Sequence, residues 1–217
     1  KAVMDNTRIK ILLPILAGIS VLLGTFLFYL AFVFNPITKE SLRNDSFFVY
    51  DVPIHIDDFS LTDHSGDTVT QDLLANKWTL VFFGYTFCPD ICPLTMASIR
   101  QFYDLLETNS AVNDVQVAMI SVDPNRDTPE KLASYVGFFN PAFIGLTGDY
   151  SSLYSLSRQM NVAFSYLRVD DENYLVTHNG EIMLIDPEGN NVGFFKAPYQ
   201  PELMLENFQA VKTYLSK

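Results

Sequence analysis

Near the N-terminus, 24 consecutive residues from Ile11 to Phe34 carry no charged side chain, and most of them are Leu, Ile, Val or Phe. A helix needs about 20 apolar residues to cross the hydrocarbon core of a bilayer, so this run is long enough for one transmembrane helix. Pro14 stands near its start, where a helix tolerates proline best. The sequence therefore predicts a membrane anchor over residues 11–34, preceded by a short inside segment, residues 1–10.

A cleaved signal peptide is the alternative for this segment. Its apolar region would span about 7–15 residues and end in a small-x-small cleavage site. The run here is longer, and it ends in FVFNP (residues 32–36), which offers no such site. Three basic side chains precede the run and two follow it closely. That excess favours an inside N-terminus and an exported C-terminal part.

After the anchor, the chain divides into a linker, residues 35–45, and one globular domain, residues 46–217. The domain carries 22 acidic and nine basic side chains, a charge difference of −13. Such a surface repels phosphate backbones and argues against nucleic-acid binding. It suits a cationic ligand or a basic partner, and it equally suits a solvated surface that has no partner.

Apolar runs and their spacing predict the secondary structure of this domain. Strands are expected at 59–62, 67–70, 78–83, 115–122, 143–146, 181–185 and 192–195. Helices are expected at 94–107, 128–139, 149–160 and 201–216. Residues 35–58 are interpreted as a linker and leading segment. The alternation of strand and helix predicts an α/β fold with a central mixed sheet flanked by helices.

The chain has only two cysteines, Cys88 and Cys92, which are too few for a fold stapled by disulfides. They stand between a predicted buried strand and the first turn of an amphipathic helix. Cysteines at i and i+4 share one face of a helical turn, with Cβ atoms about 5–6 Å apart, so they can share a soft metal ion. The helix N-terminus favours the thiolate form. The alternative is a structural disulfide, but closing so short a loop would stabilise little.

Two thiolates alone suit Cu(I) and serve dithiol chemistry equally well, whereas an added imidazole completes a site for Cu(II) or Zn. The chain offers three histidines. His55 lies in the leading segment, and His64 lies in a hairpin turn where exposure explains it. His178 comes just before a predicted core strand and can face the ends of neighbouring strands. A lone histidine is more often a surface or packing residue, and spacing alone does not decide between these roles.

Residues 84–93, GYTFCPDICP, resemble the copper motif of the Sco/SenC family of cytochrome c oxidase assembly proteins. Three further stretches are similar to that family in the same order: FSLTDHSG (59–66), SVDPNRDTP (121–129) and HNGEIMLIDP (178–187). The likeness covers residues 46–217 and includes the anchor. It implies a thioredoxin-like fold and one copper ion bound through Cys88, Cys92 and His178.

Two acidic residues and one arginine also match positions of the family. Asp90 lies between the cysteines and is interpreted as a tuning or docking residue, with plain solvation of the loop as the alternative. Asp123 carries the same interpretation, although an aspartate at a strand end also caps the next loop without any chemistry. Arg126 matches a family position without a role assigned to it.

The function that the resemblance implies is that of a metallochaperone, which assists assembly of the CuA centre in subunit II of cytochrome c oxidase, alone or with other copper chaperones. The alternative is a thiol–disulfide oxidoreductase that keeps the cysteines of that subunit reduced, with Cys88 and Cys92 as a redox-active disulfide. Thioredoxin-type exchangers separate their cysteines by two residues, whereas three separate them here. Those exchangers also carry a cis-proline that faces the active site, and no proline occurs between Pro141 and Pro187. Both points favour the metal.

The expected location is the bacterial inner membrane, with residues 46–217 in the periplasm. Nothing like an Arg-rich transit peptide precedes the anchor. The mitochondrial inner membrane, with the domain facing the intermembrane space, is the alternative with the same topology.

Overall fold

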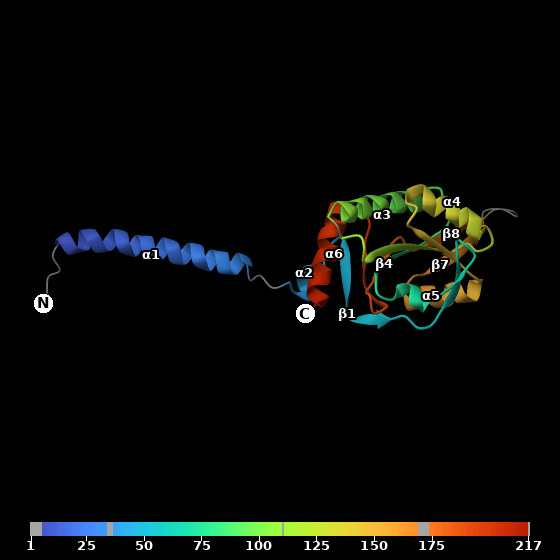
Figure 1. The fold of residues 1–217 in the computed structure, drawn as a ribbon, viewed down its shortest axis with the longest axis horizontal. Coiled ribbons are helices and arrows are strands. Elements are labelled where there is room, and N and C mark those ends of the chain that lie inside the picture. The colour runs from blue at the N-terminus through green and yellow to red at the C-terminus, as the bar shows by residue number, and fades with distance from the viewer. Residues whose placement is uncertain (1–5, 34–36, 110, 169–173, 217) are drawn as a thin grey trace. The chain divides into compact units, whose positions relative to one another are not determined.

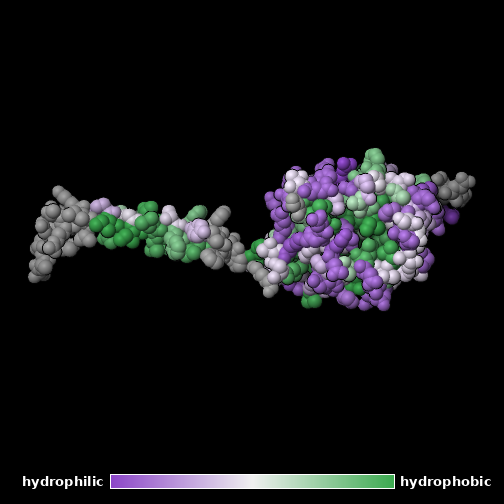
Figure 2. Space-filling model, in the orientation of Figure 1, coloured by the Kyte–Doolittle hydropathy of each residue, from purple (hydrophilic) through white to green (hydrophobic). Residues whose placement is uncertain are grey.

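A computed structural model of the chain describes residues 6–33, 37–109, 111–168 and 174–216, with side chains from residue 14 to residue 30 in the first range. The chain forms two compact units, Lys1–Thr38 and Lys39–Lys217. The first unit contains helix α1, Asn6–Val33 (Figure 1). Its large apolar side chains between Ile15 and Tyr29 are more than half exposed, and Figure 2 shows them as a hydrophobic surface.

Among the described residues, no helix has the length and hydropathy that a membrane span requires. The predicted anchor, residues 11–34, extends at both ends beyond the side chains that are described.

The second unit is built on a mixed sheet. Within the described residues it has eight strands in the order β1-β10-β9-β4-β5-β6-β2-β3. Strands β4, β5 and β6 are parallel to one another, and the other pairings are antiparallel. The strands are β1 Phe47–His55, β2 Ser60–Asp63, β3 Thr68–Thr70, β4 Trp78–Gly84, β5 Val115–Ser121, β6 Ile144–Thr147, β9 Ile182–Ile185 and β10 Asn190–Phe195. The predicted α/β architecture with a central mixed sheet is confirmed.

Helices cover both faces of this sheet. Figure 1 shows α3 and α4 on one side of it and α5 on the other. The helices expected to start at residues 128 and 149 do so at capping side chains: Thr128 Oγ1 accepts a hydrogen bond from the Lys131 amide, and the Asp149 carboxylate accepts from two amides of the first turn of α5. The helical elements are α2 Lys39–Leu42, η1 Gln71–Leu74, α3 Ile91–Thr108, α4 Pro129–Phe139, α5 Tyr150–Gln159 and α6 Pro201–Leu215.

The core lies along β4 and β5, which are buried over their whole length. Helix α3 packs on α6 through the edge-to-face pair Phe102 and Phe208, whose ring centroids are 5.8 Å apart. Trp78 of β4 meets the same Phe208 ring at 5.6 Å. Each such buried aromatic side chain contributes about 1.5–3 kcal/mol through the removal of apolar surface from water. The strand and helix that flank the cysteine loop are therefore rigid supports.

The interpretation of residues 35–58 as a leading segment is wrong in part, because residues 47–55 form the edge strand β1. It pairs antiparallel with β10 and stacks Phe48 on Phe194, with ring centroids 5.2 Å apart. Pro53 is compatible with this strand because the strand lies at the edge of the sheet and its register shifts between Val49 and Ile54. Upstream, α2 buries Leu42, so part of the predicted linker packs with the globular unit.

Strands β7, Phe164–Arg168, and β8, Tyr174–His178, form a two-stranded ribbon that the sequence analysis did not anticipate. In the described part of the chain, this ribbon does not pair with the eight-stranded sheet. Alternation along β8 buries Val176 and exposes Leu175 and Thr177. Tyr174 and His178 therefore share with Val176 the face that is turned to the domain.

Two glycine substitutions are expected to change stability in opposite directions. At Gly193 in β10, a Cβ atom would lie 2.1 Å from the Phe48 carbonyl oxygen, whereas nothing lies within 4 Å of one at Gly137 in α4. Gly193→Ala should lower the free energy of unfolding by about 1–3 kcal/mol. Gly137→Ala should raise it by about 0.5–1 kcal/mol through helix propensity. Urea unfolding of the globular unit measures both, and a neutral Gly193→Ala variant would contradict the close approach of β1 and β10.

Candidate metal centre

The cysteine loop joins the end of β4 to the start of α3. Cys92 lies in the first turn of α3, but Cys88 lies in the loop, three residues before the helix begins. The expectation that one helical turn carries both cysteines is therefore wrong for Cys88, whose amide donates to the Tyr85 carbonyl at 3.2 Å. Gly84 lets the loop approach the site, because a Cβ atom there would lie 2.7 Å from the Phe82 ring and 3.3 Å from Cys92 Sγ.

The structure brings together the three residues that the resemblance implies as ligands. The sulfur atoms of Cys88 and Cys92 and a ring nitrogen of His178 all lie within 4.8 Å of one another. Cys92 Sγ is 3.4 Å from His178 Nε2, and the Cys92 amide donates to Cys88 Sγ, also at 3.4 Å. This donation places Cys88 sulfur at the positive end of α3, where helix amides lack partners within the helix. The cluster could hold one metal ion.

His178 is oriented by its own backbone. Its Nδ1 lies 2.7 Å from the Asn179 carbonyl oxygen, which only accepts, so Nδ1 carries the proton. Nε2 is left with its lone pair turned toward Cys92. The rings of Phe82 and Tyr85 stand edge-on to the imidazole at 5.8 and 6.0 Å. Burial lowers the pKa of His178, and this favours the neutral imidazole that binds metal ions.

The two thiols differ in their surroundings. Cys92 is fully buried and Cys88 is partly exposed, and both are free cysteines. Burial, and then the hydrogen bond with Cys88, raise the pKa of the Cys92 thiol well above its ordinary value. A metal ion that binds here must therefore displace a firmly held proton from Cys92.

The acidic candidates lie outside the cluster of possible ligands. Asp90 is exposed at the N-cap position of α3, and its side chain makes no capping hydrogen bond. Asp123 is fully buried, forms an ion pair with Arg126 and accepts a hydrogen bond from Tyr174 Oη at 2.6 Å. Asp123 thus contacts the strand that carries His178.

Asp127 is a site residue that the sequence analysis did not single out. Its buried carboxylate accepts hydrogen bonds from the Thr86 amide at 3.0 Å and from the Thr86 and Ser121 hydroxyls at 2.6 Å each. These bonds fasten the start of the cysteine loop to the end of β5. The signal was present in the sequence, because Asp127 lies within the SVDPNRDTP stretch, but burial cannot be read from that motif.

The other two histidines lie away from the cluster. His64 is not a freely exposed turn residue, since its Nδ1 accepts a hydrogen bond from the Gly145 amide at 3.0 Å. His55 ends β1 and contacts Asn190 Oδ1 at 3.1 Å.

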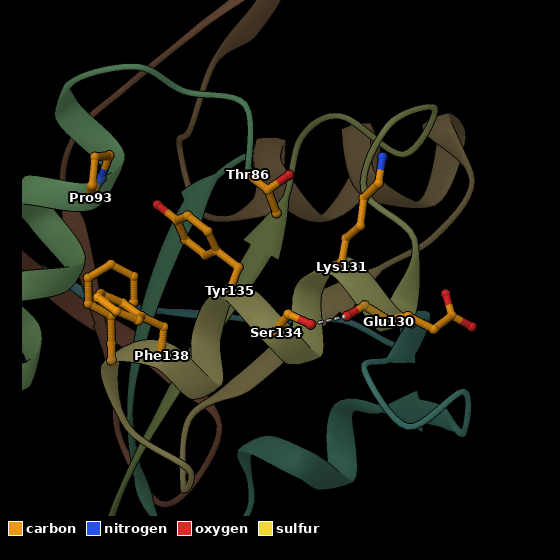
Figure 3. A pocket seen from close by; sticks show the side chains of 8 residues that line it. Thr86, Pro93, Glu130, Lys131, Ser134, Tyr135 and Phe138 are labelled. Atoms are coloured by element: carbon orange, nitrogen blue, oxygen red, sulfur yellow. Dashed lines mark hydrogen bonds between the residues drawn. The ribbon is translucent and has the colours of Figure 1, made fainter.

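A pocket of about 630 Å³ adjoins the cysteine loop. Thr86 of the loop and Pro93 of α3 line one side of the pocket, and residues of α4 line the other (Figure 3). Tyr135 projects into the pocket, and within the described residues its buried hydroxyl has no hydrogen-bond partner. Burial raises the pKa of Tyr135. The pocket thus lies beside the thiols but does not enclose them.

The comparisons with known proteins agree with this geometry. The sequence model of the SCO1/SenC family matches residues 51–213. The chain belongs to the SCO1/SenC family. Among bacterial members, it is 32% identical to a SCO2-like protein of Rickettsia prowazekii over 206 residues, or 94% of this chain and 96% of that protein.

Other members of the SCO1/SenC family are mitochondrial or have solved structures. A mitochondrial SCO1 homolog of Arabidopsis thaliana is 41% identical over 137 residues, which are 63% of this chain and 41% of that protein. The chain thus spans less than half of that relative. The crystal structure of Arabidopsis ScoI with copper bound superposes with a TM-score of 0.68 at 36% identity, over 73% of this chain and 98% of that one. The thioredoxin-like Sco fold is therefore confirmed.

The hydrogen bonds of Asp127 lead to a prediction about stability. Asp127→Ala leaves the Thr86 amide and hydroxyl without their acceptor and should lower the free energy of unfolding by about 1–3 kcal/mol. Asp104→Ala is the control, because Asp104 is half-exposed and its ion pair with Arg100 lies on the surface. That change should stay within about 0.5 kcal/mol. Urea denaturation of the metal-free protein measures both, and equal effects would contradict a fastening role for Asp127.

Proposed function

We propose that this protein is a membrane-anchored metallochaperone that binds one copper ion through Cys88, Cys92 and His178 and assists assembly of the CuA centre of cytochrome c oxidase. The observation that carries the proposal is the convergence of two sulfurs and one imidazole nitrogen within 4.8 Å. Membership of the SCO1/SenC family supports it, as does the copper bound to the related Arabidopsis protein.

The donor set fits copper in both oxidation states. Thiolates are soft ligands that select Cu(I), and imidazole nitrogen extends the site to Cu(II). Zinc also accepts sulfur and nitrogen ligands, but structural zinc sites use four protein ligands, whereas this cluster has three among the described residues. Three donors leave room for an incoming ligand from a partner, as transfer by ligand exchange requires.

Access to the site supports transfer to another protein. Cys88 is partly exposed, and the neighbouring side chains of Phe87 and Leu94 are 52% and 65% exposed. An acidic domain with exposed apolar groups around a metal ligand suits a protein partner. The partner in this proposal is the CuA-bearing domain of oxidase subunit II, with other copper chaperones as donors.

Dithiol exchange is a second candidate, favoured by the two free thiols within reach of each other. Cys88, the more accessible cysteine, would attack a target disulfide, and Cys92 would resolve the mixed disulfide. The deep burial and raised pKa of Cys92 slow that second step. We therefore assign reduction of the oxidase cysteines a secondary role.

The proposal includes one membrane span over residues 11–34. Its support is the uncharged run together with the exposed apolar side chains of α1 between Ile15 and Tyr29. The globular domain then lies in the periplasm of a bacterium, with the mitochondrial intermembrane space as the alternative.

Single substitutions of the three proposed ligands should give distinct metal-binding patterns. Cys92→Ala or Cys88→Ala should abolish tight Cu(I) binding, because one thiolate leaves an incomplete soft site. His178→Ala should weaken Cu(II) by about 100-fold or more while changing Cu(I) far less, and it should alter the thiolate-to-Cu(II) absorption band. Competition titrations with chelators for each oxidation state, together with absorption spectra, measure both.

His55→Ala is the matched control, because His55 is exposed on β1 and lies outside the cluster. It should leave both affinities and the spectrum unchanged. Unaltered Cu(II) affinity in His178→Ala would remove His178 from the site, even with both cysteines confirmed. Retained reductase activity in that variant is expected, since dithiol exchange needs no imidazole ligand.

The anchor leads to a prediction about topology. In a bacterial host, protease added to intact spheroplasts should degrade residues 46–217 of the full chain, while a cytoplasmic marker protein survives. Sodium carbonate washing should leave the chain in the membrane fraction. Full protection of the domain would overturn the orientation, and its release by carbonate would overturn the span.

A further inference from the structure

The proposed ligands come from two separately supported parts of the domain. Cys88 and Cys92 sit on the loop and helix that follow β4, whereas His178 sits on the β7–β8 ribbon. Backbone pairing does not fix this ribbon to the eight-stranded sheet within the described residues. Three residues, 179–181, tie His178 to β9 of the sheet, and side-chain contacts hold the rest of the ribbon in place, so both determine the distance between the imidazole and the thiols.

Arg126 makes the densest of these contacts. Its guanidinium carbon lies 3.8 Å from the centroid of the Tyr174 ring, and its Nη1 donates to the Tyr174 carbonyl at 3.1 Å. Its Nε forms an ion pair with Asp123, which also accepts from Tyr174 Oη at 2.6 Å. Arg126, Asp123 and Tyr174 thus form a closed triangle. Tyr174 is on the same face of β8 as His178, so the triangle fixes the strand that bears the imidazole.

The same guanidinium also reaches the cysteine loop. It lies 5.0 Å from the centroid of the Phe87 ring, and Phe87 directly precedes Cys88. It lies 5.8 Å from the ring of Tyr85, which stands edge-on to His178. Cations over aromatic faces are attracted by the ring quadrupole, more strongly when they are shielded from water. Only about a quarter of the Arg126 side chain is exposed, and Asp123 is fully buried.

We propose that Arg126 is a positioning residue that sets the distance between His178 Nε2 and the two thiols, and thereby the preference of the site for Cu(II) over Cu(I). The inference rests on the copper site of the proposed function. The two thiolates, from the loop after β4 and the first turn of α3, hold Cu(I) without the ribbon, so Cu(I) binding is insensitive to Arg126. Cu(II) needs the imidazole in place and is sensitive to it.

The test is Arg126→Gln in the full globular domain, compared with Arg126→Lys. Arg126→Gln should weaken Cu(II) binding about tenfold or more, the range typical of residues that orient metal ligands, and should shift the thiolate-to-Cu(II) absorption band. Cu(I) affinity should change less than about threefold. Lysine keeps the charge but lacks the planar fork, so Arg126→Lys should restore part of the Cu(II) affinity.

Two controls keep the result specific. Arg100→Gln changes an exposed arginine of α3 that forms a surface ion pair with Asp104, and it should leave both affinities unchanged. Tyr174→Phe removes one hydroxyl from the triangle with little loss of volume, and it should reproduce the selective Cu(II) loss in milder form. Thermal unfolding of each metal-free variant reports whether the fold is intact.

A double-mutant cycle with His178→Ala decides between outcomes. If Arg126 acts through His178, Arg126→Gln should have no further effect on Cu(II) in the His178→Ala background. Three results would overturn the positioning role while leaving the ligand set intact. The first is a full effect of Arg126→Gln in the His178→Ala background. The others are an unchanged Cu(II) affinity of Arg126→Gln, or equal losses of affinity for Cu(I) and Cu(II). If His178→Ala alone has no effect on Cu(II), the ligand set of the proposed function fails, and the positioning role fails with it.

Discussion

The complete burial of β4 and β5 is the constraint on which the rest of the domain depends. Both strands are covered on both faces and are mostly apolar, and their polar side chains Thr79 and Gln116 are hydrogen-bonded to each other, until the chain leaves the sheet at Gly84 and Ser121. Because β4 and β5 are parallel neighbours, the loops that follow them leave the sheet at the same edge. The cysteine loop after β4 and the Asp123–Asp127 loop after β5 therefore meet there, and Asp127 joins them through Thr86.

This shared edge explains the electrostatics of the centre. The thiol of Cys92 is held in its protonated form by burial, and the imidazole of His178 is held neutral for the same reason. Both of these donors therefore favour their uncharged forms when no cation is bound. The ion pair of Asp123 and Arg126 lies beside this donor set, is covered by the Tyr174 ring and remains outside the ligand cluster.

The sequence predicted the parts of the fold whose signals are local. Continuous apolar runs identified β4 and β5, and Thr128 and Asp149 marked helix starts because their side chains cap adjacent amides. Strand β1 was missed because Pro53 and scattered charges suit an edge strand as well as a linker. The ribbon was missed because its strands are short and mostly exposed. The triangle of Asp123, Arg126 and Tyr174 joins residues about 50 positions apart, which no local pattern contains.

The unequal exposure of the two cysteines has a kinetic consequence. Cys88 faces the solvent and Cys92 does not, so an approaching donor meets the ion from one direction only. A bound ion would exchange its bond to Cys88 first and release its bonds to Cys92 and His178 last, and loading would follow the reverse order. In the proposed function, the rate of handover would therefore be set by the last buried bond and not by the first exposed one.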